Sequence, residues 1–373
     1  MSVRTDKRES NFELLRIIAM LLIIAGHFVT QSGALEATTG INHWFAASVG
    51  MGHRMAVNLF VLIGTWFMVD LDFKPSRVIR LYGTVWFYSV LITLICKVCK
   101  VPVSMEEFVS AFFPVIRRAV WFASVYIGLM LLSPFLRKFR LLTLEIQRKA
   151  IIVLFLLVCV ECTLSTFMDT YLCALTWFIF LYLFMCYHKE CVKRDCSILK
   201  WNKIWYLLIG VAVYAAMIAA EGICYTFADR VPVLSMGRSL VIQYLSDYKS
   251  IPNFLSAFCI FLFFENWRMR KIRLINVFAG ATFGVYVIHQ IPVFYMFLWK
   301  NLCDCDAWIN DRMFPLYTLA VIFCVFVAGV VIDQIRTVVF EPFWLHSPLF
   351  RWINRKMDRF YQRSNEKLNS SSN

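Results

Sequence analysis

Charged side chains are scarce in this sequence. Asp, Glu, Lys and Arg make up only 17% of its 373 residues, while hydrophobic residues make up 60%. Soluble domains carry about 25% charged and roughly 45–50% apolar residues. An ordinary soluble domain is therefore excluded, because so little polar surface cannot cover so much apolar mass. An aromatic share of 17% excludes disorder for most of the chain, so an integral membrane protein remains.

Several functional signals are also missing. Cys96 and Cys99 have CxxC spacing, as do Cys159 and Cys162, but both pairs fall in apolar runs without a His at zinc-finger spacing. We therefore expect these thiols to pack in the core, and we expect no metal site. We find no cleavable signal peptide, internal repeat or soluble catalytic domain. The net charge of +14 is explained by Lys and Arg in cytoplasmic loops, so nucleic acid is not an expected partner.

Long apolar stretches dominate instead. Ten of them have about 17–23 residues, the length that a bilayer core demands, and in lipid all must be helices. They lie near residues 12–30, 47–69, 81–98, 119–136, 150–168, 171–188, 204–225, 250–267, 277–298 and 315–338. The sequence thus predicts an all-α polytopic membrane protein with about ten transmembrane helices. We expect a single transmembrane domain over 1–340 and a basic cytoplasmic tail over 341–373 with a disordered end.

Lys and Arg predict the orientation of these helices. With the N-terminus inside, the inner connections and the tail hold 27 Lys and Arg, against 9 in the outer connections. Arg16 and Arg54, the two remaining cations, lie inside or at the edge of spans. This excess on one side predicts cytoplasmic termini and a multi-pass protein of the cell membrane.

The first apolar stretch carries ionisable residues on one face. Arg16 and His27 are eleven residues apart, which is three helical turns plus about 20° and roughly 16 Å along the axis. Glu13 lies within about 40° of the same stripe. Ionisable groups in hydrocarbon cost at least a few kcal/mol, so each is a candidate site residue. Arg16 can instead snorkel to lipid phosphate, and His27 can simply bond another helix, but neither explains the shared face.

Further polar residues fall in or beside later stretches. Arg77 and Arg80 share a helix face at the inner interface, where they can hold a polyphosphate or merely anchor the helix. His289 lies about as deep as His27, so the two can line one cavity or only bond other helices. Glu161 can orient or activate a histidine, although nothing in the sequence pairs them. Trp121 is expected in an aromatic belt at the outer surface.

The run SNFELLRIIAMLLIIAGHF resembles the opening of the acyltransferase-3 family of integral-membrane O-acyltransferases, which start with Arg or Lys, ten residues, then His. Arg16 and His27 fit that spacing, and Arg77 and Arg80 match the family's Arg-x-x-Arg. Three further blocks, at 57–64, 121–136 and 283–293, bring the resemblance to residues 10–300. Relatives often have Ser-Gly-Tyr-Phe where this chain has Gly-Thr-Trp-Phe at 64–67, so no second-span Ser is expected to act.

The resemblance implies transfer of an acyl group, usually acetyl, from acyl-CoA to a hydroxyl of a cell-surface polysaccharide or its lipid-linked precursor. Acetyl-CoA would be the donor substrate, and Arg16, Arg77 and Arg80 would hold it. His27 would act as general base or as a transient acyl carrier. His289 and Glu161 are the other catalytic candidates. The length implies a stand-alone form without the hydrolase-like domain that some relatives carry.

Two other functions use the same residue types. A transporter or flippase for a small anion or a lipid-linked sugar also places Arg and His inside the membrane. Against it, we find no repeat symmetry between the two halves and no matching broken spans. A membrane enzyme with another donor, such as a lipid phosphate, is the third alternative, and binding of CoA separates the first function from both others.

Overall fold

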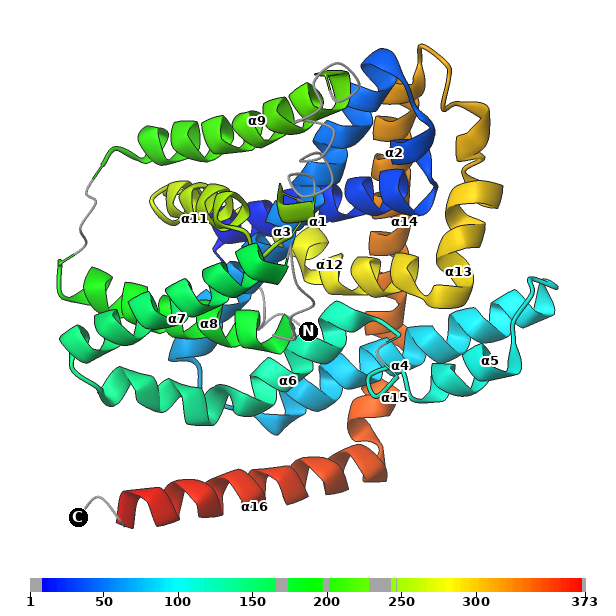
Figure 1. Cartoon of the computed structure of the whole chain (residues 1–373). Helices are drawn as coiled ribbons and strands as arrows, with labels where there is room; N and C mark the ends of the chain where they lie inside the picture. Colours follow the sequence, from blue (N-terminus) through cyan, green and yellow to red (C-terminus); the bar gives the residue numbers. More distant parts are fainter. Residues whose placement is uncertain are drawn as a thin grey trace.

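The computed structural model describes residues 9–117, 119–165, 174–196, 201–227, 243–245 and 247–370, without the side chains of 159–165 and 362–370. Helices and short connections make up all of this described part, and no strand occurs in it. Figure 1 shows the helices as one bundle, with α16 lying along its lower edge at the end of an arm formed by α14 and α15. The all-α polytopic fold is therefore confirmed.

The helices follow the predicted apolar stretches. In chain order they are α1 (Ser10–Gln31), α2 (Ala34–Ala37), α3 (Gly40–Asp70), α4 (Pro75–Val98), α5 (Met105–Phe112), α6 (Trp121–Leu136), η2 (Arg137–Leu141), α7 (Leu144–Ser165), α8 (Ala174–Lys193), α9 (Lys203–Phe227), α11 (Ile251–Glu265), α12 (Arg273–Gln290), α13 (Pro292–Met296), η3 (Phe297–Leu302), η4 (Cys305–Ala307), α14 (Phe314–Val339), α15 (Glu341–His346) and α16 (Pro348–Ser370). The predicted tail is thus helical from Glu341 to Ser370, apart from Ser347 between α15 and α16.

Fewer helices than ten meet the requirements of a full membrane span. Within the described residues, six are long and apolar enough by themselves, or seven if the bent pair α12 and α13 crosses as one. The helix α11 has 15 residues, which is short for a crossing. The number ten therefore stays a prediction.

The ninth apolar stretch is broken, whereas a single span over 277–298 was expected. Its two helical parts meet at an angle of 77°. Ile291 is extended, with φ −63° and ψ 123°, and Pro292 begins the next helix. Proline disfavours a helical conformation in the residue before it and lacks the N–H that would continue the ladder. The bend therefore ends α12 directly after His289 and Gln290, inside the bundle.

The helices α1 and α3 form the centre of the bundle. In α1, 67% of an 18-residue stretch is buried, and in α3 the share is 72%. The corresponding share is 28% in α9 and in α14. The side chains of Leu15, Ala19, Ile24 and Phe28 on α1 are completely buried. A helix that is apolar all round is expected at such a central position. Any site built on α1 is therefore enclosed by other helices.

Hydrogen bonds at the start of α1 align it with α12. Ser10 Oγ donates to Asn276 Oδ1 and accepts from the backbone N–H of Ile272, both at 2.9 Å. The number of residues from Ser10 to His27 equals the number from Ile272 to His289. Both helices run the same way and rise roughly 25 Å over that length. The two histidines are thereby brought to the same level.

Candidate functional site

A cavity of ≈ 380 Å³ lies among α1, α3, α6 and α12, and we call it the histidine cavity. Its polar lining residues are His27, Thr30, Gln31, His53, Arg54 and Gln290. Its aromatic lining residues are Phe60, Trp121, Phe122, Tyr248, Phe283 and Tyr286. A concave, mostly apolar space with a few convergent polar groups is the usual form of a ligand site.

His27 and His289 form a direct pair, with 3.0 Å between His27 Nδ1 and His289 Nε2. His289 Nδ1 lies 2.7 Å from the Val285 carbonyl oxygen, which can only accept, so this nitrogen must carry a hydrogen. In neutral His289 the other nitrogen, Nε2, is then an acceptor, and His27 Nδ1 must donate to it. The remaining nitrogen of His27, Nε2, is left with a free lone pair.

His53 brings a third imidazole to the same place. Its ring centroid is 5.5 Å from that of His27, and its Nδ1 donates over 2.8 Å to the Gly50 carbonyl. The close approach depends on Gly26, because a Cβ at this position would lie 2.2 Å from the Cβ of His53. Gly26 therefore lets α1 and α3 pack closely enough for the two rings to share the cavity.

Arg54 also lines the histidine cavity, and sequence reasoning assigned it no role. Sequence reasoning likewise missed His53 and Tyr248. It expected Trp121 in an interfacial belt. In the structure Trp121 lines the histidine cavity and stacks on Tyr248, with 5.7 Å between ring centroids. A signal for Arg54 was present, since it and Arg16 are the two cations within or beside the predicted spans. Nothing comparable marked His53 or Tyr248.

Arg16 lies at the other end of the same stripe on α1. Its Nη1 is 2.6 Å from Glu13 Oε2, and its side chain is 21% exposed. Met20, one turn further along, already lines the histidine cavity. Arg16 also interacts electrostatically with Tyr126 on α6, whose hydroxyl occupies the space beside Gly64 where a side chain would otherwise be. Arg16 is thus about one helical turn from the cavity lining, on the side from which the chain enters α1.

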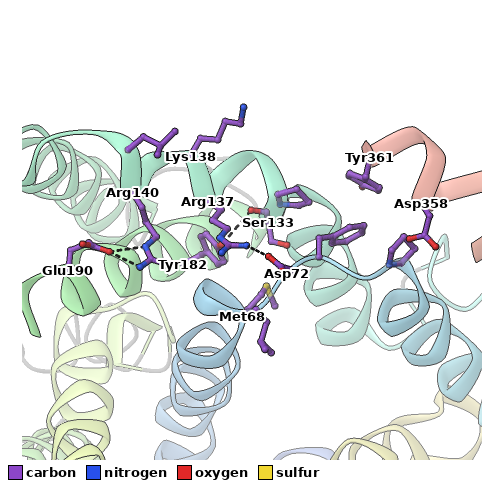
Figure 2. Close-up of a pocket in the computed structure, with 15 residues that line it drawn as sticks. Met68, Asp72, Ser133, Arg137, Lys138, Arg140, Tyr182, Glu190, Asp358 and Tyr361 are labelled. Carbon is purple, nitrogen blue, oxygen red and sulfur yellow. Dashed lines mark hydrogen bonds and ion pairs between the residues drawn. The ribbon is translucent and has the colours of Figure 1, made fainter. Parts of the chain in front are cut away.

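A second pocket, of ≈ 680 Å³, lies where α3 and α6 end, and we call it the Arg137 pocket (Figure 2). Its charged lining residues are Asp72, Arg137, Lys138, Arg140, Glu190 and Asp358. Arg140 is held by Glu190 at 2.7 Å and Asp70 at 3.1 Å, both carboxylates of neighbouring helices. Arg137 donates over 2.9 Å to the exposed Asp72, and this hydrogen bond holds the pKa of Asp72 below its usual value.

Aromatic side chains close the other end of the Arg137 pocket. Phe73 and Tyr361 lie with their ring centroids 4.2 Å apart, and Figure 2 shows Tyr361 and Asp358 at the end away from Glu190. Tyr361 comes from α16 and donates over 3.0 Å to the Leu131 carbonyl of α6. The predicted tail therefore contributes one wall of this pocket.

The structure separates Arg77 from Arg80, which the sequence placed on one face. Arg77 Nη1 donates over 3.0 Å to the carbonyl oxygen of Asp72, a residue that lines the Arg137 pocket. Arg80 Nε is 2.9 Å from Glu341 Oε1, in a small cleft that Arg336 and Trp344 also line. Arg77 thus lies with the cations of η2, while Arg80 pairs with the carboxylate of α15.

Glu161, the third catalytic candidate, has its backbone in α7, and its side chain lies outside the described residues. Within the residues that are described, no group of three or more His, Cys, Asp or Glu side chains is arranged to hold a metal ion.

Comparison with known proteins gives one result. A family model described as an acyltransferase domain, that of the acyltransferase-3 family, matches residues 9–334. Searches among curated proteins and among solved structures gave no match. The matched segment includes α1, α3, α6 and α12, and therefore the whole frame of the histidine cavity.

Proposed function

Since the chain belongs to the acyltransferase-3 family and is a multi-pass membrane acyltransferase, we propose that it moves an acetyl group from acetyl-CoA to a hydroxyl of a cell-surface polysaccharide or its lipid-linked precursor. It would do so in the cell membrane, as a step of polysaccharide biosynthesis for the cell envelope. The observation that carries this proposal is the hydrogen-bond relay from Val285 through His289 to His27.

The relay suits His27 for general base catalysis. Its Nε2 lone pair takes the proton of the acceptor hydroxyl while that oxygen attacks the thioester carbonyl. The C–S bond then breaks, and the CoA thiolate takes the proton back from His27. His289 positions the ring and stabilises the imidazolium, because its Nε2 accepts the hydrogen on His27 Nδ1 in both states.

The distance between the two pockets suits a CoA thioester. On α3, Phe60 lines the histidine cavity and Met68 lines the Arg137 pocket, and the helical rise separates them by roughly 12 Å. On α6, Phe122 lines the histidine cavity and Ser133 lines the Arg137 pocket, and the helical rise separates them by about 16 Å. An extended pantetheine arm has about twelve chain atoms at roughly 3.5 Å per three atoms, so it spans about 14 Å.

In this arrangement the donor enters from the predicted cytoplasmic side. Its phosphates would meet Arg137, Lys138 and Arg77, and its arm would pass Arg16 on the way to His27. Lys138 has an ammonium group that makes no ion pair with a described residue, and Arg137 can exchange the exposed Asp72 for a phosphate. Arginine is well suited to such charged, paired hydrogen bonds.

A genetic complementation experiment tests the proposal. The ester content of surface glycans is compared in cells that lack the protein and in cells restored with the wild-type chain, with His27→Gln or with Arg351→Gln. Arg351 lies exposed on α16, so its variant is a matched surface control. The proposal predicts esters with the wild-type chain and with Arg351→Gln, and none with His27→Gln. Equal ester content with and without the wild-type chain would contradict it.

A further inference from the structure

Arg54, the cation of the histidine cavity, forms no close ion pair. In the part of the chain that the structure describes, the Arg54 side chain makes no hydrogen bond and no ion pair. Asp247 attracts Arg54 electrostatically but forms no ion pair with it. The Asp247 carboxylate lies 3.6 Å from the Lys249 ammonium and accepts the Lys249 backbone N–H. By contrast, Arg16, Arg137 and Arg140 each have a carboxylate oxygen within 3.1 Å.

An unpaired guanidinium inside a bundle is costly. A buried ion that is not paired carries an effective desolvation penalty of several kcal/mol, and Arg cannot escape it by losing its proton. Such a charge is therefore expected to pair with a ligand when the cavity is filled. The cavity volume of ≈ 380 Å³ leaves room for that ligand beside His27.

The level of Arg54 places it next to the reacting atoms. His27 lies in α1, which starts at Ser10, and Arg54 lies in α3, which ends at Asp70. The number of residues between each side chain and that helix end is about the same. Both rise roughly 25 Å from the same side of the bundle. Along α3, the helical rise puts Arg54 about 21 Å from Met68 at the Arg137 pocket, beyond the reach of the pantetheine arm. The donor phosphates therefore cannot pair with it.

A passing oxyanion is also a poor partner for Arg54. The thioester oxygen is negative only near the transition state, so the guanidinium would stay unpaired in the free, substrate-bound and product-bound protein. Neutral hydrogen-bond donors suffice for such an oxygen. A permanent anion on the second substrate would pair with Arg54 throughout the bound states.

The rest of the cavity wall is suited to a polar ring compound. Trp121 and Tyr248 are stacked at an interplanar angle of 20° and present aromatic surface. Gln31 and Gln290 exchange hydrogen bonds at 3.2 and 3.3 Å, and Gln31 is fixed by Trp299 at 2.8 Å. Amides held in this way provide donors and acceptors for hydroxyl groups.

Resting on the proposed function, we propose that Arg54 binds a fixed anionic group of the acceptor, so that the acylated unit is an acidic glycan residue. The group is a carboxylate or a phosphate on the residue whose hydroxyl faces His27 Nε2. Both anions accept two parallel hydrogen bonds from one guanidinium. Arg54 thus selects the acceptor and aligns its hydroxyl, while His27 removes the proton.

The test starts from the product. Glycans from cells that carry the wild-type chain are fragmented, and mass spectrometry identifies the residue that bears the ester. The inference predicts a carboxylate or a phosphate on that same residue. An ester on an uncharged residue would overturn the inference and leave the proposed function intact. If the wild-type chain adds no ester at all, the proposed function itself fails, and this inference with it.

Kinetics of the purified full-length chain then test the residue. Arg54→Gln should raise the acceptor KM about 10–100-fold, the range for a charged hydrogen bond, while CoA affinity stays unchanged. Arg54→Lys should retain most activity, because it keeps the charge. Carboxyl-reduced and dephosphorylated forms of the acceptor show which anion is bound, since only its removal should abolish the difference between wild type and Arg54→Gln. An unchanged acceptor KM in Arg54→Gln would overturn the inference.

Discussion

Replacement of His289 is the most informative change in the relay, because this side chain contacts His27 and does not itself line the cavity. His289→Leu keeps a similar volume but leaves the hydrogen on His27 Nδ1 without an acceptor. His289→Gln keeps an acceptor atom near the same place. We therefore expect the Leu variant to be slow and the Gln variant to recover part of the rate.

The expected size of the effect follows from the charge on His27. A hydrogen bond to neutral His27 is worth about 0.5–1.5 kcal/mol, and one to the imidazolium about 1.5–3 kcal/mol. The difference acts on the transition state, where the proton is being transferred. Loss of the acceptor should thus lower kcat about 5–13-fold, the factor that corresponds to a difference of about 1–1.5 kcal/mol. The KM for acetyl-CoA should change little, since His289 lies away from the donor's phosphates.

The assay follows release of CoA thiol by the purified chain in the presence of acceptor, with acetyl-CoA binding measured separately. A Leu variant within twofold of the wild-type kcat would refute the role of His289 in positioning His27. A Leu variant that lost acetyl-CoA binding as well would show damage to the fold instead, and the Gln variant then decides.

Two further outcomes are expected. Gly26→Ala should lower the free energy of unfolding by about 1–3 kcal/mol and abolish transfer, because its Cβ would overlap His53. Gly128→Ala is the control and should be tolerated, because its Cβ would make ordinary contact at 3.5 Å. Thermal unfolding and activity measurements check both variants. Arg77→Ala should weaken CoA binding about 10–100-fold. Arg80→Ala should mainly lower the melting temperature, because Glu341 then keeps only Arg336 as a partner, and calorimetry that found the reverse would dismiss this division.

The sequence alone predicted the features that depend on hydrophobicity and helical repeat. Apolar length located the helices, and the eleven-residue spacing placed Arg16 and His27 on one face of α1. The comparable depth of His27 and His289 was also predictable, because both stretches enter from one side. Their direct hydrogen bond was only one of two possibilities, since the rotation of α12 about its axis depends on side chains of other helices.

Contacts between distant segments account for what the sequence did not predict. Arg80 finds its partner in Glu341, near the other end of the chain, and no periodicity reports such a pair. Tyr248 reaches the cavity because Asn58 Nδ2 donates over 2.7 Å to its carbonyl oxygen. The bend at Pro292 has a local cause and was within reach of sequence reasoning, but apolar length concealed it.

Acetyl transfer by purified His27→Gln, measured beside its acetyl-CoA binding, is the most direct test of the central claim. The substitution removes the base while keeping a polar side chain of similar size. Our account predicts wild-type acetyl-CoA affinity and a transfer rate lower by about 10²–10⁴-fold. A well-folded variant that kept a third of the wild-type rate would contradict it, because the lone pair of His27 would then not carry the reaction.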